Sequence, residues 1–237
     1  MDLTSFDELF SGPEVIERMK NISKSSHDVA TQFWRAPMVG EHLTPRQKEL
    51  IYFAMHASAS ALNVDALRRQ QKRVFAAGGT EEDIVDVLIS IVGLANHALY
   101  SSVPVLEEEW KAAGKPLAIP DENATVAAAK KRFIAIRGFW NNDRDSVARQ
   151  MPEYFAALSN MSTESWYRGS LTRKEREFIC IGIDCNVTHT YEPGLRTHIR
   201  NAIREGATKG EILEIFQLAA LMGLEGYVLT AEALAGK

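Results

Sequence analysis

The apolar residues of this chain gather into runs of helical length, and a polar capping signal precedes several of these runs. In a capping box, a Thr side chain accepts from the third backbone amide of the helix while a Glu or Gln side chain reaches back. Three pairs have this spacing: Thr44 with Gln47, Thr172 with Glu175, and Thr208 with Glu211. Gly78 and Gly206 stand where helices often end in a left-handed residue. The pattern therefore predicts capped helices.

The sequence also repeats itself, because residues 43–98 align without a gap with residues 171–226 at a constant shift of 128 positions. The identical pairs are Leu43/Leu171, Thr44/Thr172, Glu49/Glu177, Ile51/Ile179, Leu67/Leu195, Arg68/Arg196, Gly78/Gly206, Thr80/Thr208 and Ile84/Ile212. The capping signals and glycine stops fall at equivalent places in both stretches. We therefore predict two copies of one helical unit, named copy 1 (43–98) and copy 2 (171–226).

One segment of copy 2 is ambiguous, because Ile179, Ile181 and Ile183 alternate with other residues as they would in a buried strand. The matching residues 49–59 of copy 1 are rich in Ala, lack strict alternation and follow the same cap, which favours a helix in both places. We expect Glu192-Pro193-Gly194 to break copy 2 and turn the chain, with a short helix over about 195–205 after the break. The predicted fold class is all-α.

The segment 111–125, which contains Gly114, Pro116 and Pro120, has the composition of a linker. It divides the chain into a first repeat region at 1–110 and a second at 126–237. Further helices are expected near residues 13–22, 125–137 and 152–158. We predict that the first region is a degenerate repeat and that the second carries the active copy.

Composition and charge restrict the function classes. A net charge of −4 and a pI of about 5.9 argue against a nucleic-acid partner, because phosphate binding needs a concentrated basic surface. No stretch approaches the roughly 20 uninterrupted apolar residues of a membrane span, and the acidic N-terminus lacks the basic region of a secretory signal. Cys180 and Cys185 fit neither a disulfide framework nor a redox pair. We expect a cytoplasmic protein with a small-molecule substrate.

Copy 2 carries two motifs that belong together. The first is Leu-Thr-x-x-x-x-Glu before an apolar helix, and the second is the set His198, Ala202, Gly206, Thr208 and Glu211. In this combination the sequence resembles the carboxymuconolactone decarboxylase family, which includes the AhpD-like alkylhydroperoxidases. The resemblance is clear over 171–226 and weaker over 43–98. It implies an all-α, AhpD-like fold made by tandem duplication, and a homo-oligomer, expected to be a trimer of two-copy chains.

His198 is the strongest candidate for chemistry, since it matches the His of the family motif and an imidazole moves protons near neutral pH. Copy 1 has Gln70 at this position, which does not titrate. Glu177, like its counterpart Glu49, matches the acidic residue that belongs to a proton relay in the AhpD-like members. The alternatives are a buried histidine that bridges helices and, for the Glu in both copies, a structural ion pair with a neighbouring Arg.

Copy 2 also gains polar side chains around its predicted break. His189 and Tyr191 stand where copy 1 has Ala61 and Asn63, and we expect both to converge with His198 on one pocket. As metal ligands the two His residues lack a standard spacing, and no third ligand is evident. We therefore expect neither a metal nor a cofactor.

Arg196 and Arg200 lie four residues apart on one helix face, where Arg196 is suited to hold a substrate carboxylate. A solvated basic face is the alternative for Arg200. The AhpD-like motif places Cys-x-x-Cys twelve and fifteen residues after the Glu, where this sequence has His189 and Glu192. Peroxidase chemistry needs those thiols, so the substitution argues against it.

The resemblance implies a cofactor-independent enzyme similar to γ-carboxymuconolactone decarboxylase. Its substrate would be a small carboxylated lactone or oxo acid of aromatic catabolism. We expect His198, His189 and Glu177 to be catalytic, and Tyr191 and Arg196 to bind the substrate. The alternatives are a non-catalytic, small-molecule-binding member of the family and, less favoured by the residues, an alkylhydroperoxidase-like antioxidant protein.

Overall fold

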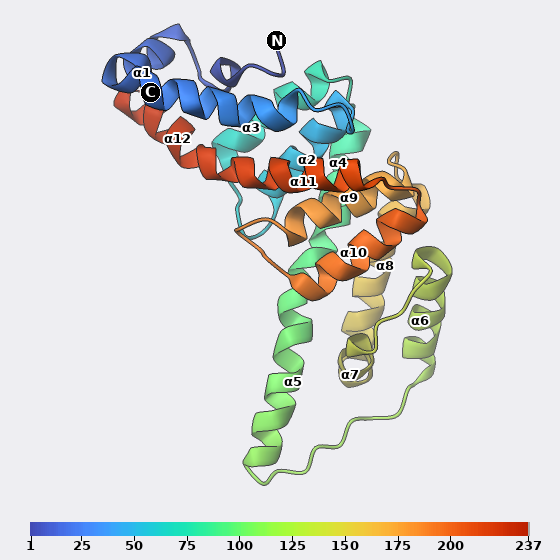
Figure 1. The fold of residues 1–237 in the computed structure, drawn as a ribbon. Helices are drawn as coiled ribbons and strands as arrows, with labels where there is room; N and C mark the ends of the chain where they lie inside the picture. The colour runs from blue at the N-terminus through green and yellow to red at the C-terminus, as the bar shows by residue number, and fades with distance from the viewer. Residues whose placement is uncertain (237) are drawn as a thin grey trace. The chain divides into compact units, whose positions relative to one another are not determined.

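The computed structural model describes residues 1–236, and within that range it consists of helices and connecting turns without a strand. The helices follow one another along the chain from blue to red in Figure 1. The predicted all-α class is confirmed. Contacts group the chain into two compact units: unit 1 is Met1–Ile84 with Thr172–Lys237, and unit 2 is Val85–Leu171.

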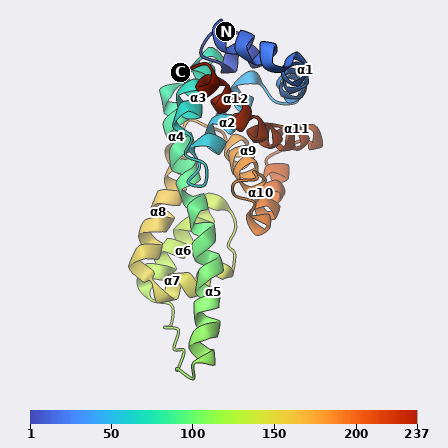
Figure 2. The same cartoon turned by 90° about the vertical axis from the view of Figure 1, so that its left-hand side faces the viewer.

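Unit 1 is built around the helix α9. Its helices are η1 (Phe6–Leu9), α1 (Pro13–Met38), α2 (Pro45–Ala57), α3 (Val64–Ala76), α9 (Arg173–Asp184), α10 (Glu192–Arg204), α11 (Lys209–Ala220), η3 (Leu221–Leu224) and α12 (Glu225–Leu234). α9 packs against α10, α2 and α11, and both Figure 1 and Figure 2 show α10 beside it. Residues 176–184 of α9 are all buried, as are the equivalent residues 48–56 of α2. A helix buried on all sides is a core helix.

Unit 2 has a core of its own. After α4 (Glu81–Val92), which contains the boundary, its helices are η2 (Gly93–Asn96), α5 (His97–Ala112), α6 (Ala124–Arg137), α7 (Asp143–Gln150) and α8 (Pro152–Arg168). α8 packs against α6 and α7. The buried side chains are Tyr100, Val103, Val126, Ala129, Val147, Ala148, Phe155 and Leu158.

The repeat recurs helix by helix. α2, α3 and α4 begin at residues 45, 64 and 81, and α9, α10 and α11 begin at residues 173, 192 and 209, with the same shift throughout. The three predicted capping boxes are all formed, before α2, α9 and α11. Gly78 and Gly206 both have left-handed backbones, with φ of 85° and 84°. Equivalent local signals in the two copies thus give equivalent helices.

The prediction for the Pro-Gly pair of copy 2 was wrong. Pro193 and Gly194 do not end a helix but lie in the first turn of α10, which begins at Glu192. The preceding helix, α9, already ends at Asp184. Proline is well tolerated in a first helical turn because its missing N–H has no intrahelical partner there.

The loop between the first two helices has the same strained shape in both copies. Leu62 and Thr190 occupy equivalent positions and have positive φ angles of 41° and 39°, which are unfavourable for side chains of this size. The next residue in each copy donates its backbone N–H to the last turn of the preceding helix, Asn63 to the carbonyl of His56 and Tyr191 to that of Asp184. The loop therefore returns directly to the end of the preceding helix.

The predicted linker is partly irregular. Residues 113–123 lie between α5 and α6 and form no helix. This segment belongs to unit 2, whose residues come from both sides of it. That residues 111–125 link two domains, 1–110 and 126–237, stays a prediction.

Two stretches, Glu81–Ala112 and Lys209–Leu234, are long and apolar enough to cross a membrane by length and composition alone. Buried core helices pass the same test, and Lys209–Leu234 contains the 3-10 turn Leu221–Leu224 and packs within unit 1. The stretches are therefore weak evidence for a membrane span. A cytoplasmic location stays a prediction.

Replacement of Leu62 by Asn is expected to raise the free energy of unfolding by about 0.5–1 kcal/mol, because Asn tolerates the left-handed conformation that costs other residues about 1–2 kcal/mol. Leu62 is 61% exposed, so little burial is lost. Leu62→Ala is the matched control, since Ala shortens the side chain but has no amide that can stabilise the left-handed conformation by a local hydrogen bond. Urea unfolding followed by circular dichroism measures both, and an equal effect of Asn and Ala would show that the strain contributes nothing.

Candidate active site

A buried carboxylate and an imidazole face each other between α9 and α10. Glu177 lies in the middle of α9 and is 2% exposed, and His198 lies in α10 and is 6% exposed. The Nδ1 atom of His198 is 2.5 Å from Oε2 of Glu177. Asn201, three residues further along α10, donates its Nδ2 to Oε1 of Glu177 at 3.2 Å. α10 thus supplies a bond to each oxygen of this carboxylate.

The environment of His198 favours the charged imidazolium. Burial lowers the pKa of His198, but its interactions with Cys180 and with the Glu177 carboxylate raise that pKa by more, to well above the usual value for histidine. Because Nδ1 is bound to Glu177, Nε2 is the nitrogen that is left to exchange a proton with another group. The arrangement is suited to hold a proton and deliver it at Nε2.

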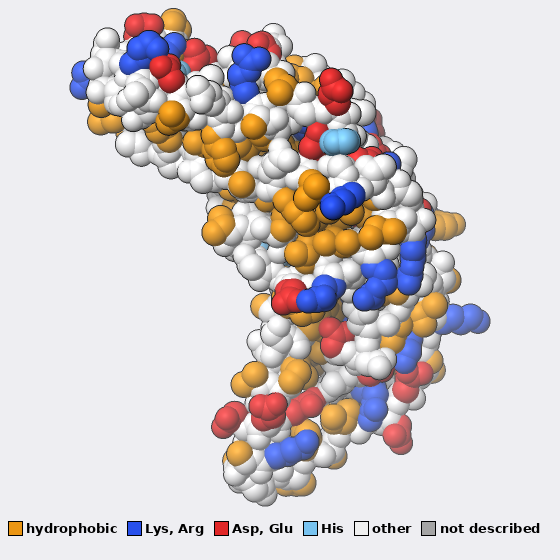
Figure 3. Space-filling model, in the orientation of Figure 1, with side chains coloured by type: hydrophobic (Ala, Val, Ile, Leu, Met, Phe, Trp, Pro, Cys, Tyr) orange, Lys and Arg blue, Asp and Glu red, His pale blue; other side chains and the backbone are white. Residues whose placement is uncertain are grey.

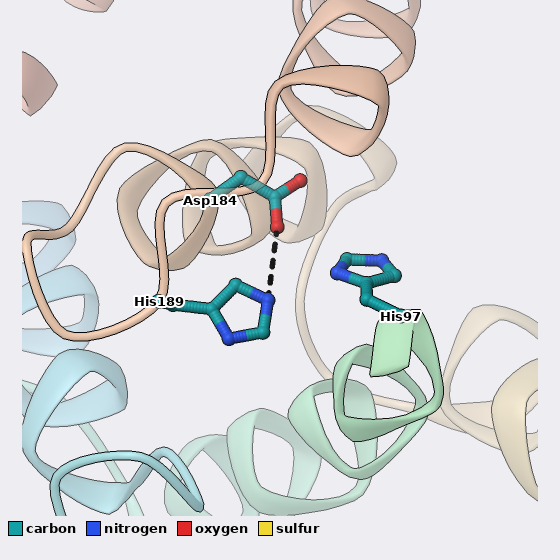
Figure 4. A group of neighbouring side chains, drawn as sticks. All are labelled: His97, Asp184 and His189. Carbon is teal, nitrogen blue, oxygen red and sulfur yellow. Dashed lines mark ion pairs between the residues drawn. The ribbon is translucent and has the colours of Figure 1, made fainter. Parts of the chain in front are cut away.

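Asp184, which the sequence analysis missed, lies beside both histidines. It is the last residue of α9 and is 1% exposed. Its Oδ1 is 3.7 Å from Nε2 of His189, the pair joined by the dashed line in Figure 4, and its Oδ2 is 3.9 Å from Nε2 of His198. Burial raises the pKa of Asp184, the positive charge of His198 lowers it, and the negative charge of Glu177 raises it. The net result is a pKa of about 7.

His189 and Tyr191 belong to the loop that connects α9 to α10. The ring centroids of the two side chains are 6.4 Å apart and meet edge to face. His189 is partly exposed, and burial of the remainder of its ring lowers its pKa. Tyr191 is the N-cap residue of α10. The structure therefore brings His189 and His198 together through Asp184, with Tyr191 next to His189.

Arg196 lies away from this cluster. Its side chain is 72% exposed and pairs with Glu192, one turn earlier on the outer face of α10. Glu177, for which an arginine partner was one of the alternatives, is bonded by His198 and Asn201. A role for Arg196 in substrate binding stays a prediction.

In copy 1 the equivalent carboxylate has an arginine as its partner. Glu49 accepts from Nη2 of Arg73 at 2.7 Å and from Nε at 3.0 Å, and both side chains are buried. Arg73 is the counterpart of Asn201, and the counterpart of His198 is the buried Gln70. Copy 1 thus forms a bidentate ion pair where copy 2 has an imidazole.

The counterpart of Asp184 is also held by an ion-pair network. At that place copy 1 has His56, whose Nε2 is 3.3 Å from Oε1 of Glu225. Nη2 of Arg69 donates to both oxygens of Glu225 at 2.7 Å. Burial opposes the ionised form, but His56 and Arg69 outweigh it and lower the pKa of Glu225 to about 2. The counterpart of Arg69 in copy 2 is Thr197.

The two copies differ in the side chains that face their buried carboxylates. Arg69 and Arg73, which stay charged at any physiological pH, are replaced in copy 2 by Thr197 and Asn201. The carboxylates of copy 2 face histidines instead, which can gain and lose a proton. Copy 2 therefore has groups that acid–base chemistry can use, whereas copy 1 has two arginines at the equivalent places of α3.

The two cysteines do not form a Cys-x-x-Cys pair. Cys180 is buried, and burial together with the charge of Asp184 raises the pKa of the Cys185 thiol to about 12. A thiol with such a pKa forms almost no thiolate near neutral pH, and the thiolate is the nucleophile in peroxidase chemistry. This agrees with the missing Cys-x-x-Cys motif.

Residues 152–235 match the model of the carboxymuconolactone decarboxylase family. These residues, about a third of the chain, are similar to that family. The matched range contains α9, α10 and all of the titratable residues described in copy 2. The resemblance drawn from the sequence motifs is confirmed.

A solved structure extends the likeness to nearly the whole chain. It is that of a protein from Burkholderia xenovorans LB400 described as a candidate γ-carboxymuconolactone decarboxylase subunit, which is 29% identical in sequence with a TM-score of 0.89. The match covers 97% of this chain and 94% of that one. No curated protein matches the sequence. The two-copy chain thus has a solved relative of the same architecture.

Glu49→Gln and Glu177→Gln are expected to differ in cost although they remove equivalent carboxylates. The first leaves the Arg73 charge buried without its partner, which costs about 3–5 kcal/mol. The second leaves His198, which can lose its proton, so we expect about 1–2 kcal/mol. Unfolding by urea at pH 8 compares the two variants, and equal losses would contradict the distinction between the copies.

Proposed function

We propose that this chain is a cofactor-independent carboxy-lyase that acts by proton transfer on a small carboxylated lactone or oxo acid of aromatic catabolism. The observation that carries the proposal is the buried pair of His198 and Glu177 in copy 2, at the place where copy 1 has an arginine ion pair. The family match and the relative from Burkholderia support the choice of reaction class.

The substrate itself accommodates the electrons of such a reaction. When the bond to the carboxylate carbon breaks, carbon dioxide leaves and the electron pair spreads into the unsaturated lactone as a dienolate. His198 then transfers the proton on Nε2 to the carbon, while Glu177 stabilises the imidazolium and fixes its orientation through Nδ1. One proton from solvent restores His198, so each turnover consumes one proton.

The remaining residues have supporting roles in this proposal. His189 and Tyr191, side by side in the loop, are placed to hydrogen-bond a lactone oxygen. Arg196, on the exposed face of α10, would attract the anionic substrate by its charge. A non-catalytic, small-molecule-binding member would be favoured by a His198 bonded to backbone, whereas here its partner is a carboxylate side chain.

His198→Ala is expected to lower kcat for release of carbon dioxide from γ-carboxymuconolactone by about 10²–10⁴, the usual contribution of a general acid. Gln70→Ala, at the equivalent place in copy 1, is the control and is expected to keep the wild-type rate. Circular dichroism verifies that both variants fold. A folded His198→Ala protein with unchanged turnover would sink the assignment.

We also propose that the chain assembles into a homotrimer. Figure 3 shows hydrophobic side chains gathered on the face over α10 and α11, and these helices carry the exposed residues Ile203 and Leu213. A contiguous apolar patch of this kind is typical of an interaction surface. Sedimentation equilibrium should give three times the chain mass of 26.4 kDa, and a monomer at micromolar concentration would exclude the trimer.

A further inference from the structure

We propose that Asp184 is a second proton-carrying residue of this site, which exchanges a proton with Nε2 of His198, and that Gly194 lacks a side chain so that Asp184 can lie there. The exchange with His198 deepens the proposed function and rests on it. The position and protonation of Asp184 are tested without a substrate.

Besides Glu177, two groups interact with the His198 ring, the Cys180 thiol and the Asp184 carboxylate. Its Nδ1 is bound to Glu177, and the group 3.9 Å from its Nε2 is Oδ2 of Asp184. That separation exceeds a direct hydrogen bond. A water or substrate oxygen about 2.8 Å from each atom bridges such a gap, and bridges of this kind transmit protons. Asp184 is therefore positioned to act through the proton on His198.

The other oxygen of Asp184 leads toward solvent. Oδ1 is 3.7 Å from Nε2 of His189, as Figure 4 shows, and the His189 ring is 18% exposed while Asp184 is buried. Solvent thus reaches His189 more readily than it reaches Asp184 or His198. The Asp184 carboxylate thus lies between the buried ring of His198 and the partly exposed ring of His189. A proton relay requires this arrangement.

Gly194 makes room for this carboxylate. A Cβ atom at Gly194 would lie 2.4 Å from Oδ2 of Asp184 and 2.8 Å from Cδ1 of Tyr191, both far inside van der Waals contact. Gly194 lies in the first turn of α10, where exposed backbone amides favour a nearby negative charge. Any other residue there would displace the Asp184 carboxylate.

In copy 1 the equivalent positions have neither the glycine nor the aspartate. The counterpart of Gly194 is Ala66 and that of Asp184 is His56. His56 faces Glu225, which Arg69 already holds through both oxygens. The side-chain-free position and the carboxylate therefore occur together in copy 2 and are both absent from copy 1.

The charges around Asp184 suit a group that changes its protonation near neutral pH. Within unit 1 it faces Glu177 on its own helix, His198 on α10 and His189 in the loop, with the Cys185 thiol adjacent. Burial raises the pKa of Asp184 to about 7. Its carboxyl group is thus expected to be close to half protonated at physiological pH.

Each step of the proposed relay breaks one bond to hydrogen and forms another. His198 gives the proton on Nε2 to the carbon from which carbon dioxide has left. The Asp184 carboxyl group then loses its O–H proton through the bridging atom to Nε2, which restores the imidazolium. Asp184 regains a proton from solvent by way of His189. No oxidant or reductant takes part, and the net change is the single proton that decarboxylation consumes.

The first experiment follows the Asp184 carboxyl carbon by nuclear magnetic resonance in protein labelled with ¹³C at aspartate, with Asp184→Asn to assign the signal. We expect a titration midpoint near pH 7 in the wild type. His198→Ala and Gly194→Ala should both move the midpoint. Gly226→Ala, where a Cβ meets nothing within 4 Å, should leave it in place. A midpoint near the ordinary value of about 4, or one that neither variant moves, would overturn the proposal.

The second experiment measures kcat and KM against pH with γ-carboxymuconolactone. Asp184→Asn is expected to lower kcat about 10–100-fold and to remove an inflection near pH 7 while KM changes little. Asp65→Asn, an exposed carboxylate in copy 1, is the control with no expected change. If Asp184→Asn keeps both kcat and the inflection, the relay is wrong. If the wild type releases no carbon dioxide, the proposed function and the relay step fail together, and the resonance titration still decides the state of Asp184.

Discussion

The structure of unit 1 depends on how the buried carboxylate of Glu177 is satisfied. α9 is packed on most sides, and an ionised group in its middle is costly unless other groups bond to it. α10 supplies those bonds from His198 and Asn201, which lie three residues apart on one helix face. The interaction that holds the two helices in register therefore also sets the tautomer and direction of the imidazole. Stability and chemistry share the same hydrogen bond.

The two copies show two solutions to one electrostatic problem. Arg73 holds Glu49 with a bidentate bond and never loses its charge, which suits a core that only has to remain folded. His198 holds Glu177 through a single ring nitrogen and remains able to titrate. The weaker partner is the one that leaves a nitrogen available. A buried site that transfers protons gives up part of the stability that an arginine would provide.

The helices, their caps and the repeat were predictable from the sequence because they depend on local signals that occur twice. The comparison of the copies also identified His189 and His198, since both are gained in copy 2. Asp184 and Asn201 were missed, although each differs from its counterpart, because their importance arises from where α9 ends and from which face α10 presents. The exposed position of Arg196 follows from the same helical phase, two residues from a buried histidine.

Glu225 belongs to copy 2 by sequence, yet its carboxylate is bonded by Arg69 of copy 1 and lies 3.3 Å from Nε2 of His56 of copy 1. The copies are thus interlocked, as two subunits of a dimer would be. In an assembly of identical chains, every substitution appears in both partners at once. Covalent fusion removes that symmetry, so that equivalent positions of one molecule can carry different residues, as Arg73 and Asn201 do. In a tandem chain one copy can keep its stabilising ion pairs while the other copy acquires substitutions. In a symmetric dimer each such substitution would occur in both subunits.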